Sequence, residues 1–326
     1  MPLPGGNSGN PIRSLTGATR AGAPLAASRA VAPDLAPWFT WISAAAGELA
    51  AEQTVRCGML GDHACIRILF GGAWTAQTAD GPMAFAPGDR GMTLYFGPQT
   101  RYMPISVTGS YKVLTLTLAA GSPPALGLAG QTAMLDRIVE GDTFAGRGSL
   151  SASIPIGGTY GQWIAALESE LRELVATTRP RVPGRVVAAF ERASLTRPDF
   201  RIADFAAAQH VSQRTVERAV MRSFGLTPKQ VLRRARALDT AARLLGVASP
   251  DEEAAMELRY YDQSHQSREI RRFFGMTPGE LARGAHPMLR LNIELRQSRR
   301  LLMLSKAGEP ADRPWRDPAA EPEIGG

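Results

Sequence analysis

A five-residue pattern occurs twice in the C-terminal half of the chain, with an offset of 50 residues. Phe224-Gly-Leu-Thr-Pro228 aligns with Phe274-Gly-Met-Thr-Pro278, and the same offset aligns Arg218 with Arg268. A glycine after a helix suits a left-handed C-terminal cap, and Thr-Pro suits an N-cap followed by the first helical residue. Each copy therefore predicts one helix that ends at glycine and another that begins at proline.

The first copy closes a predicted pair of short helices. One helix spans about residues 201–209, His210-Val211 forms a turn, and Ser212 caps the next helix. Val216 and Val220 recur on one face of that second helix, so its opposite face is polar. The polar side chains that this unit offers outward are Ser212, Gln213, Arg214, Glu217, Arg218 and Arg222.

The second copy follows the same order of elements. A helix over about residues 252–258 precedes Tyr260-Tyr261, which pack near the turn, and Asp262 caps the next helix. The corresponding outward side chains are Gln263, Ser264, His265, Ser267, Arg268 and Arg272. Between the two units, residues 229–245 have an apolar stripe at helical spacing, which predicts one long bridging helix.

Two such units indicate helix-turn-helix organisation, in which the second helix of each unit enters the major groove of DNA. Arginine can bond bidentately to guanine and glutamine to adenine, while flanking arginines and helix N-termini bind phosphates. The alternative is a helical bundle whose arginine-rich faces are only solvated. Matching arginine positions in both copies favour DNA, and the twelve outward residues are the predicted contacts.

The charge distribution agrees with a nucleic-acid partner for the same region. Residues 181–300 contain 22 Arg and Lys against 13 Asp and Glu, whereas the rest of the chain contains 15 and 17. The net charge of +7 thus belongs to one part of the chain. A basic domain beside a nearly neutral one favours an anionic partner for the basic part.

The N-terminal part has short apolar runs separated by Gly and Pro, which predicts a small β-sandwich or barrel. The predicted strands are residues 65–70, 92–96, 105–107 and 111–118, and the turns between them include Gly71-Gly72, Asp80-Gly81-Pro82, Pro87-Gly88-Asp89 and Gly97-Pro98. An amphipathic helix follows at Gln162–Thr177. It is equally suited to a dimer contact and to the core of the β-rich domain.

The fold class is therefore α+β, with an N-terminal β-rich domain and a C-terminal all-α domain in which a long helix joins two helix-turn-helix units. The predicted organisation is a disordered leader (1–30), a β-rich sensor or dimerisation domain (31–158), an amphipathic linker helix (159–183), a DNA-binding domain (184–288), and a C-terminal helix with a disordered tail (289–326).

Several of these residues resemble the AraC/XylS family of bacterial transcription regulators over about residues 185–284. The resemblance rests on Ser212-Gln-Arg-Thr-Val-Glu-Arg218, on Tyr260-Tyr-Asp-Gln-Ser-His265, on Arg268 and on the two Phe-Gly-x-Thr-Pro ends. It implies a seven-helix DNA-binding domain, and Phe96-Gly-Pro-Gln-Thr-Arg101 looks like the cupin-like sensor domain of one subgroup. Arg259 and Gln266 depart from the family pattern, so the second unit is expected to dock more than to read bases.

Enzymatic readings have less support. A cupin enzyme needs clustered metal ligands, but His63 is the one histidine of the N-terminal part. Cys57 and Cys65 have neither an adjacent base nor another evident activating group, and two cysteines without a secretory signal fit a reducing compartment. We expect no enzyme activity, no metal and no cofactor. The alternative is a cupin-type enzyme or small-molecule binding protein with an accessory DNA-binding domain.

The function predicted from the sequence is sequence-specific DNA binding by a transcription regulator that inserts two recognition helices into successive major grooves. Double-stranded DNA is the expected partner, together with a homodimer mate, and RNA polymerase and a small-molecule effector are further candidate partners. The sequence has no run of about 18 apolar residues without charges, so it predicts no membrane span. The expected location is the cytoplasm.

Overall fold

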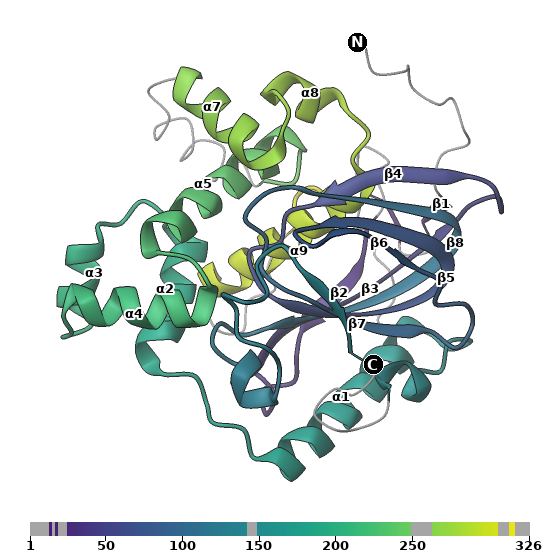
Figure 1. Cartoon of the computed structure of the whole chain (residues 1–326), viewed down its shortest axis with the longest axis horizontal. Coiled ribbons are helices and arrows are strands. Elements are labelled where there is room, and N and C mark those ends of the chain that lie inside the picture. Colours follow the sequence, from purple (N-terminus) through teal and green to yellow (C-terminus); the bar gives the residue numbers. More distant parts are fainter. Residues whose placement is uncertain are drawn as a thin grey trace.

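The computed structural model describes residues 13–14, 17–18, 25–141, 149–248, 263–305 and 313–316. A curved antiparallel sheet lies beside a group of helices, and helix α9 (Pro287–Leu304) runs between them (Figure 1). The α+β fold class is confirmed, with the β-rich part at the N-terminal side of the chain and the helical part at the C-terminal side.

Within the described residues the sheet has nine strands, all paired antiparallel. Its main path runs β1-β3-β8-β5-β7-β9, while β2 pairs with β3, β4 with β8 and β6 with β5. The strands are β1 (Arg13–Ser14), β2 (Ala27–Ala30), β3 (Phe39–Glu48), β4 (Thr54–Met59), β5 (Cys65–Thr78), β6 (Gly81–Phe85), β7 (Met92–Phe96), β8 (Met103–Leu118) and β9 (Ile138–Glu140).

Two predictions about the strands are wrong in an instructive way. The predicted strands at 105–107 and 111–118 are one strand, β8, and the predicted turn at Gly71-Gly72 lies inside β5. Gly71 and Gly72 both have φ of +63°, and the register of β5 against β8 shifts between Gly71 and Ala73. The glycines therefore form a β-bulge that bends a continuous strand. Glycine is typical of such bulges as well as of turns. The predicted strand Met92–Phe96 and the turn at Asp80 are confirmed.

Helix α1 (Tyr160–Thr178) belongs to the core of the β-rich domain. Thr159 caps it in a capping box with Gln162, and Trp163, Leu167 and Leu171 are almost fully buried against the sheet. Side chains from alternate positions of β5, such as Ile66, share that cluster. The apolar stripe of α1 is thus used inside the domain, which agrees with the core-helix alternative.

The leader predicted to extend to residue 30 ends earlier. Ala27–Ala30 form strand β2 on β3, and Leu25 and Ala26 are buried. A stretch rich in Ala and Ser has too weak a local signal for a strand, and pairing with β3 supplies the missing stabilisation. The predicted disorder of residues 1–12, 15–16 and 19–24 concerns positions outside the described residues.

The helical part surrounds the bridging helix that the sequence predicts. Its helices are α2 (Arg185–Thr196), α3 (Ile202–Ala208), α4 (Gln213–Phe224), α5 (Pro228–Leu244), α7 (Gln263–Phe274), α8 (Pro278–Arg283) and α9. Short 3₁₀ turns, η1 (Pro123–Leu126) and η3 (Leu150–Ser153), lie in the β-rich part. The predictions for the helix at 252–258, for Tyr260-Tyr261 and for the cap at Asp262 fall outside the described residues.

The sequence predicts disorder after the C-terminal helix, but residues 313–316 lie against the sheet. Trp315 and Arg316 are buried, and the Arg316 guanidinium donates to Glu294 of α9 and to the carbonyl oxygen of Ala26. The composition of this segment predicts disorder. The residues that order positions 313–316 lie far away in the sequence, so no local pattern indicates them. The prediction for residues 306–312 and 317–326 falls outside the described residues. Of the helices described, none is long and apolar enough to span a bilayer.

Candidate nucleic-acid interface

The first helix-turn-helix unit has the local geometry that its sequence predicts. Helix α3 ends at Ala208, and His210 takes a left-handed conformation (φ +55°) at the turn. The Ser212 side chain then accepts a hydrogen bond from the Thr215 backbone N–H at 3.1 Å, which caps α4. The turn and the cap together set the angle between α3 and α4.

An aromatic cluster supports α4 from behind. Phe190 of α2 is fully buried, and its ring centroid lies 5.4 Å from that of Phe205 and 5.7 Å from that of Phe224, both edge to face. Val216 and Val220 of α4 are also fully buried in this cluster. Closely packed cores of this kind fix side-chain positions, so the outer face of α4 is held by its inner face.

The outer face of α4 is polar and exposed. Its exposed side chains are Gln213, Arg214, Glu217, Arg218, Met221 and Arg222, and Ser212 is exposed at its start. Such a face offers guanidinium forks, an amide and a carboxylate to base edges. Met221 is not among the residues predicted from the sequence, although its position three residues after Arg218 places it on the same face. This exposed methionine, 38% accessible, adds an apolar group to the face.

The ends of the recognition helices match the repeated pattern. Gly225 has φ of +70° and Gly275 has φ of +72°, so both glycines supply the predicted left-handed caps. Thr227 and Thr277 then open α5 and α8, each in a reciprocal capping box with the residue three positions later. In α8 the backbone N–H and the side chain of Thr277 hold the pKa of Glu280 below its ordinary value.

The second unit presents fewer described contacts. Arg268 and Arg272 are exposed on α7, and Ser267 is half-buried. Gln263, Ser264 and His265 belong to the first turn of α7, but their side chains lie outside the described residues. Ile270 and Phe274 are buried on the opposite face of the helix. The structure thus brings the predicted residues of α7 onto one helix without placing the first three side chains.

The second unit is tied to other parts of the molecule. The Arg233 guanidinium of α5 donates to the Glu269 carboxylate of α7, and this hydrogen bond raises the pKa of Arg233. The backbone N–H of Tyr102, between β7 and β8, donates to the Phe273 carbonyl oxygen at 2.6 Å. The end of α7 therefore rests on the bridging helix and on the β-rich domain.

Candidate enzyme residues are placed differently from the recognition residues. Cys57 and Cys65 are free and buried, and the side chain of His63 is 6% exposed. Within the described ranges, no three His, Cys, Asp or Glu side chains gather as metal ligands.

Comparison with known proteins agrees with the geometry of the helical part. A family model described as a helix-turn-helix domain matches residues 205–284, which span both units and the bridging helix. This domain is of the AraC type. No curated protein matches the chain.

Several solved structures have a similar arrangement at low identity. ToxT from Vibrio cholerae is 9% identical, with a TM-score of 0.43 over 75% of this chain and 99% of ToxT. The C-terminal domain of AraT from Geobacillus stearothermophilus is 20% identical, with a TM-score of 0.28 over 32% of this chain and 88% of AraT. The AraC-like transcriptional activator CuxR is 12% identical, with a TM-score of 0.27 over 64% and 79%. Because these scores are low, the assignment depends on the domain match.

Proposed function

We propose that this DNA-binding transcription regulator reads its site mainly through α4 and positions itself on the duplex with α7. The observation that carries the proposal is the exposed face of α4, which is polar at nearly every position and is backed by a closed aromatic cluster. A helix held in this way can enter the major groove without losing its own packing. Two recognition helices would then occupy successive grooves.

Each polar side chain of α4 has a base edge that suits it. Arg214 and Arg218 suit the two acceptors of guanine, Gln213 suits adenine, and the Glu217 carboxylate suits the amino group of cytosine. Ser212 and the N-terminus of α4 suit a phosphate, which would fix the register. Arg222 lies at the end of the same face and suits the DNA backbone.

We assign a smaller reading role to α7. Its described exposed residues are arginines, which suit phosphates as well as guanine, and its end is fastened to the β-rich domain. Arg268 is the residue of α7 best placed for a base contact, and Arg272 would contact the backbone. Gln263, Ser264, His265 and Ser267 remain proposed contacts from the sequence.

Selection of bound duplexes from a random pool by the purified protein tests the proposal. We expect two enriched sequence blocks whose centres are about 10–10.5 base pairs apart. Arg218→Ala should weaken discrimination at one or two base pairs of one block by about 1–3 kcal/mol. Arg56→Ala is the matched control, because Arg56 is an exposed arginine on β4 of the β-rich domain.

Two outcomes would count against the proposal. Equal weakening of all sequences by Arg218→Ala would make Arg218 a phosphate contact. Affinity that does not fall as salt rises would argue against the basic helices as the binding surface, since counterion release makes such binding strongly dependent on salt. The homodimer, the small-molecule effector, RNA polymerase and the cytoplasmic location stay predictions from the sequence and the resemblance.

A further inference from the structure

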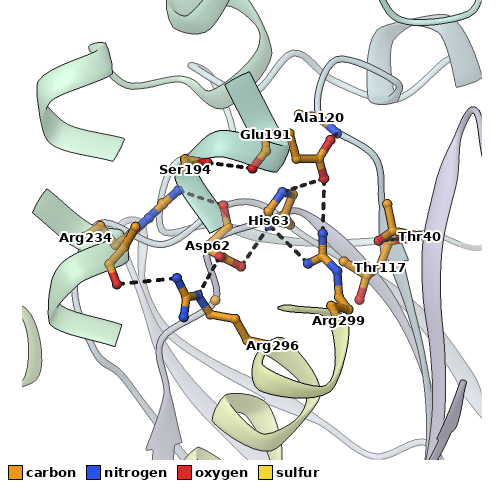
Figure 2. Close-up of polar contacts among 12 residues, drawn as sticks. Thr40, Asp62, His63, Thr117, Ala120, Glu191, Ser194, Arg234, Arg296 and Arg299 are labelled. Carbon is orange, nitrogen blue, oxygen red and sulfur yellow. Dashed lines mark hydrogen bonds and ion pairs between the residues drawn. The ribbon is translucent and has the colours of Figure 1, made fainter. Parts of the chain in front are cut away.

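A histidine lies buried where the β-rich domain meets the helices. His63 follows β4 in the loop before β5, and its side chain is 6% exposed (Figure 2). Nδ1 lies 2.8 Å from Oδ1 of Asp62 in the same loop, and Nε2 lies 2.8 Å from Oε1 of Glu191 in α2. The contact at Nε2 has the distance of an ion pair but lacks hydrogen-bond alignment. The ring thus bridges a loop of one domain and a helix of the other.

The second oxygen of Glu191 strengthens this bridge. It accepts a hydrogen bond at 3.0 Å from the backbone N–H of Ala120, which follows β8. Glu191 is 6% exposed, so α2 brings a buried carboxylate to the β-rich domain. A buried carboxylate needs a paired charge, and His63 and Arg299 are the two cations in contact with it.

Further charged groups face this bridge from two other helices, α9 and α5. Arg299 of α9 pairs with Glu191 at 3.1 Å, and its Nη1 lies 3.4 Å from Nδ1 of His63. Arg296 of α9 pairs with Asp62 at 3.1 Å. Arg234 of α5 donates to the backbone carbonyl oxygen of Asp62 at 2.7 Å. His63 thus has two carboxylates in direct contact, and three guanidinium groups contact those two residues.

These surroundings favour the charged ring. Burial lowers the pKa of His63, but the carboxylates of Asp62 and Glu191 outweigh both burial and the repulsion of Arg299, so the pKa is raised above 6.5. In return, His63 and the neighbouring arginines hold the pKa of Asp62 well below its ordinary value, against the effect of burial. The pKa of Glu191 is lowered in the same way.

The bridge also touches the recognition helix. The His63 ring lies edge to face with Phe224, the last residue of α4, at a centroid distance of 6.1 Å. Phe224 packs in turn on Phe190 of α2. Nearby, a Cβ at Gly225 would lie 2.8 Å from the carbonyl oxygen of Gln131, so the β-rich domain also approaches the cap of α4 closely. A change at His63 thus acts on both helices that hold the α4 face.

We propose that protonated His63 is a positioning residue for the first helix-turn-helix unit, holding the β-rich domain against α2 and α4 in a proton-dependent manner. The proposal deepens the DNA-reading function and rests on it only for the consequence at DNA. When the ring loses its proton it can donate from one nitrogen only, and Asp62 and Glu191 lose the positive charge between them. Nδ1 can then accept a hydrogen bond from Arg299. This changes the contacts within the joint, by which we mean the cluster of Asp62, His63, Glu191 and Arg299 between the β-rich domain and the helices.

The direction of the pH effect follows from the raised pKa. Docking takes up a proton at pH values between the pKa of the free ring, about 6.5, and the higher pKa of the docked ring. The contribution of His63 to docking is therefore full below about pH 6.5 and is lost as pH rises through the docked-state pKa. Because the pKa values of Asp62 and Glu191 are lowered, docking also weakens at acidic pH, where these carboxylates take up protons. Within that window the docking equilibrium constant should fall as pH rises, by at most about tenfold per pH unit.

Thiol labelling measures the docking without DNA. Cys65 is buried and lines a cavity of about 40 Å³ at the joint together with His63 and Arg299. In full-length protein with Cys57→Ala, the labelling rate of Cys65 is divided by the rate in the unfolded chain at the same pH. This ratio corrects for the ionisation of the thiol itself. We expect the protection of Cys65 from labelling to fall as pH rises from about 6.5 to the docked-state pKa of His63.

The variants separate a proton-dependent role from a merely structural one. His63→Gln should give weaker protection that no longer changes with pH over the same pH range. Arg56→Ala is again the control, because Arg56 is an exposed charged residue on β4 of the β-rich domain, and it should behave like the parent. A pH dependence that persists in His63→Gln would overturn the proposal.

A second variant decides the question if His63→Gln does not fold. Glu191→Gln removes one of the two carboxylates that raise the pKa of His63, so the upper end of the pH window should move down. An unmoved upper end would also overturn the proposal. DNA affinity across the same pH range, at fixed salt, should follow the labelling curve for the parent. Labelling that depends on His63 in a protein that binds no DNA would contradict the proposed function and leave the joint intact.

Discussion

The two helix-turn-helix units end in the same five-residue pattern but are held in different ways. The first unit packs on a cluster centred on Phe190, which includes Val216, Val220 and Phe224 and, from the β-rich part, Ala120. The second unit shares its cluster with α9 and with the inner face of the sheet, so that Phe274 and Ile293 belong to the same cluster as Trp74. A repeated motif thus fixes the ends of helices without fixing what lies behind them.

This difference in packing supports different roles for the two units in DNA binding. A helix backed mainly by a cluster of neighbouring helices keeps its shape when the β-rich domain shifts, which suits it to reading bases. A helix whose packing continues into another domain moves with that domain, which suits it to setting the position of the whole protein on DNA. The Tyr102–Phe273 hydrogen bond and the Arg233–Glu269 pair fasten the second unit in this way.

The largest effect is expected from Phe190→Ala, which removes the centre of the first cluster. The loss should cost about 3–5 kcal/mol, because a large buried ring leaves a cavity that helices cannot close fully. Urea unfolding gives the loss of stability, and hydrogen exchange shows where it falls. Amides of α2 and α4 should exchange faster while those of α7 stay protected. Equal loss of protection in both helices would remove the distinction between the units.

An intermediate effect is expected from arginines at equivalent positions of the two recognition helices. Arg268→Ala should reduce base discrimination by less than the 1–3 kcal/mol expected of a reading arginine, which is the range assigned to Arg218→Ala. Competition between the selected duplex and single-base variants measures both. If Arg268→Ala abolishes discrimination in its own block, the second unit reads bases as the first does and the proposed division of roles fails.

The smallest effect is expected from the caps that open the recognition helix and α8. Ser212→Ala removes the acceptor for the Thr215 N–H and should cost about 1 kcal/mol of stability, as should Thr277→Ala in its capping box. Thermal unfolding measures both losses. Only Ser212→Ala should also weaken binding to the selected duplex, since Ser212 begins the reading face. A larger DNA effect from Thr277→Ala would reverse the proposed ranking of the units.

Local patterns in the sequence predict the helical part well. The turn at His210, the cap at Ser212 and the left-handed glycines at 225 and 275 depend on residues within one or two turns of chain, so their chemistry is visible locally. The domain match over residues 205–284 agrees with this part of the prediction. The contacts proposed for α4 all lie on an exposed face, because helical spacing determines which residues share a side.

The joint between the domains could not be predicted in this way. From the sequence, His63 has no partner pattern and reads as a structural residue, yet its partner Glu191 lies 128 positions away. In the sequence, the arginines up to residue 300 count toward a basic region that favours an anionic partner, whereas Arg296, Arg299 and Arg300 are buried against carboxylates of other elements. Buried ion pairs carry no periodicity that separates them from exposed charges, so only the fold identifies them.

The contact between Arg316 and Ala26 has a consequence for the order of events during synthesis. Ala26 leaves the ribosome 290 residues before the arginine that donates to it. At ordinary rates of translation that interval is about 15–60 s. The carboxylate of Glu294, which is 1% exposed in the finished protein, has no Arg316 until then. The carbonyl oxygen of Ala26 therefore stays without this partner until the end of synthesis, and a chain that stalls late would hold a finished reading helix beside a β-rich domain that lacks its last contact.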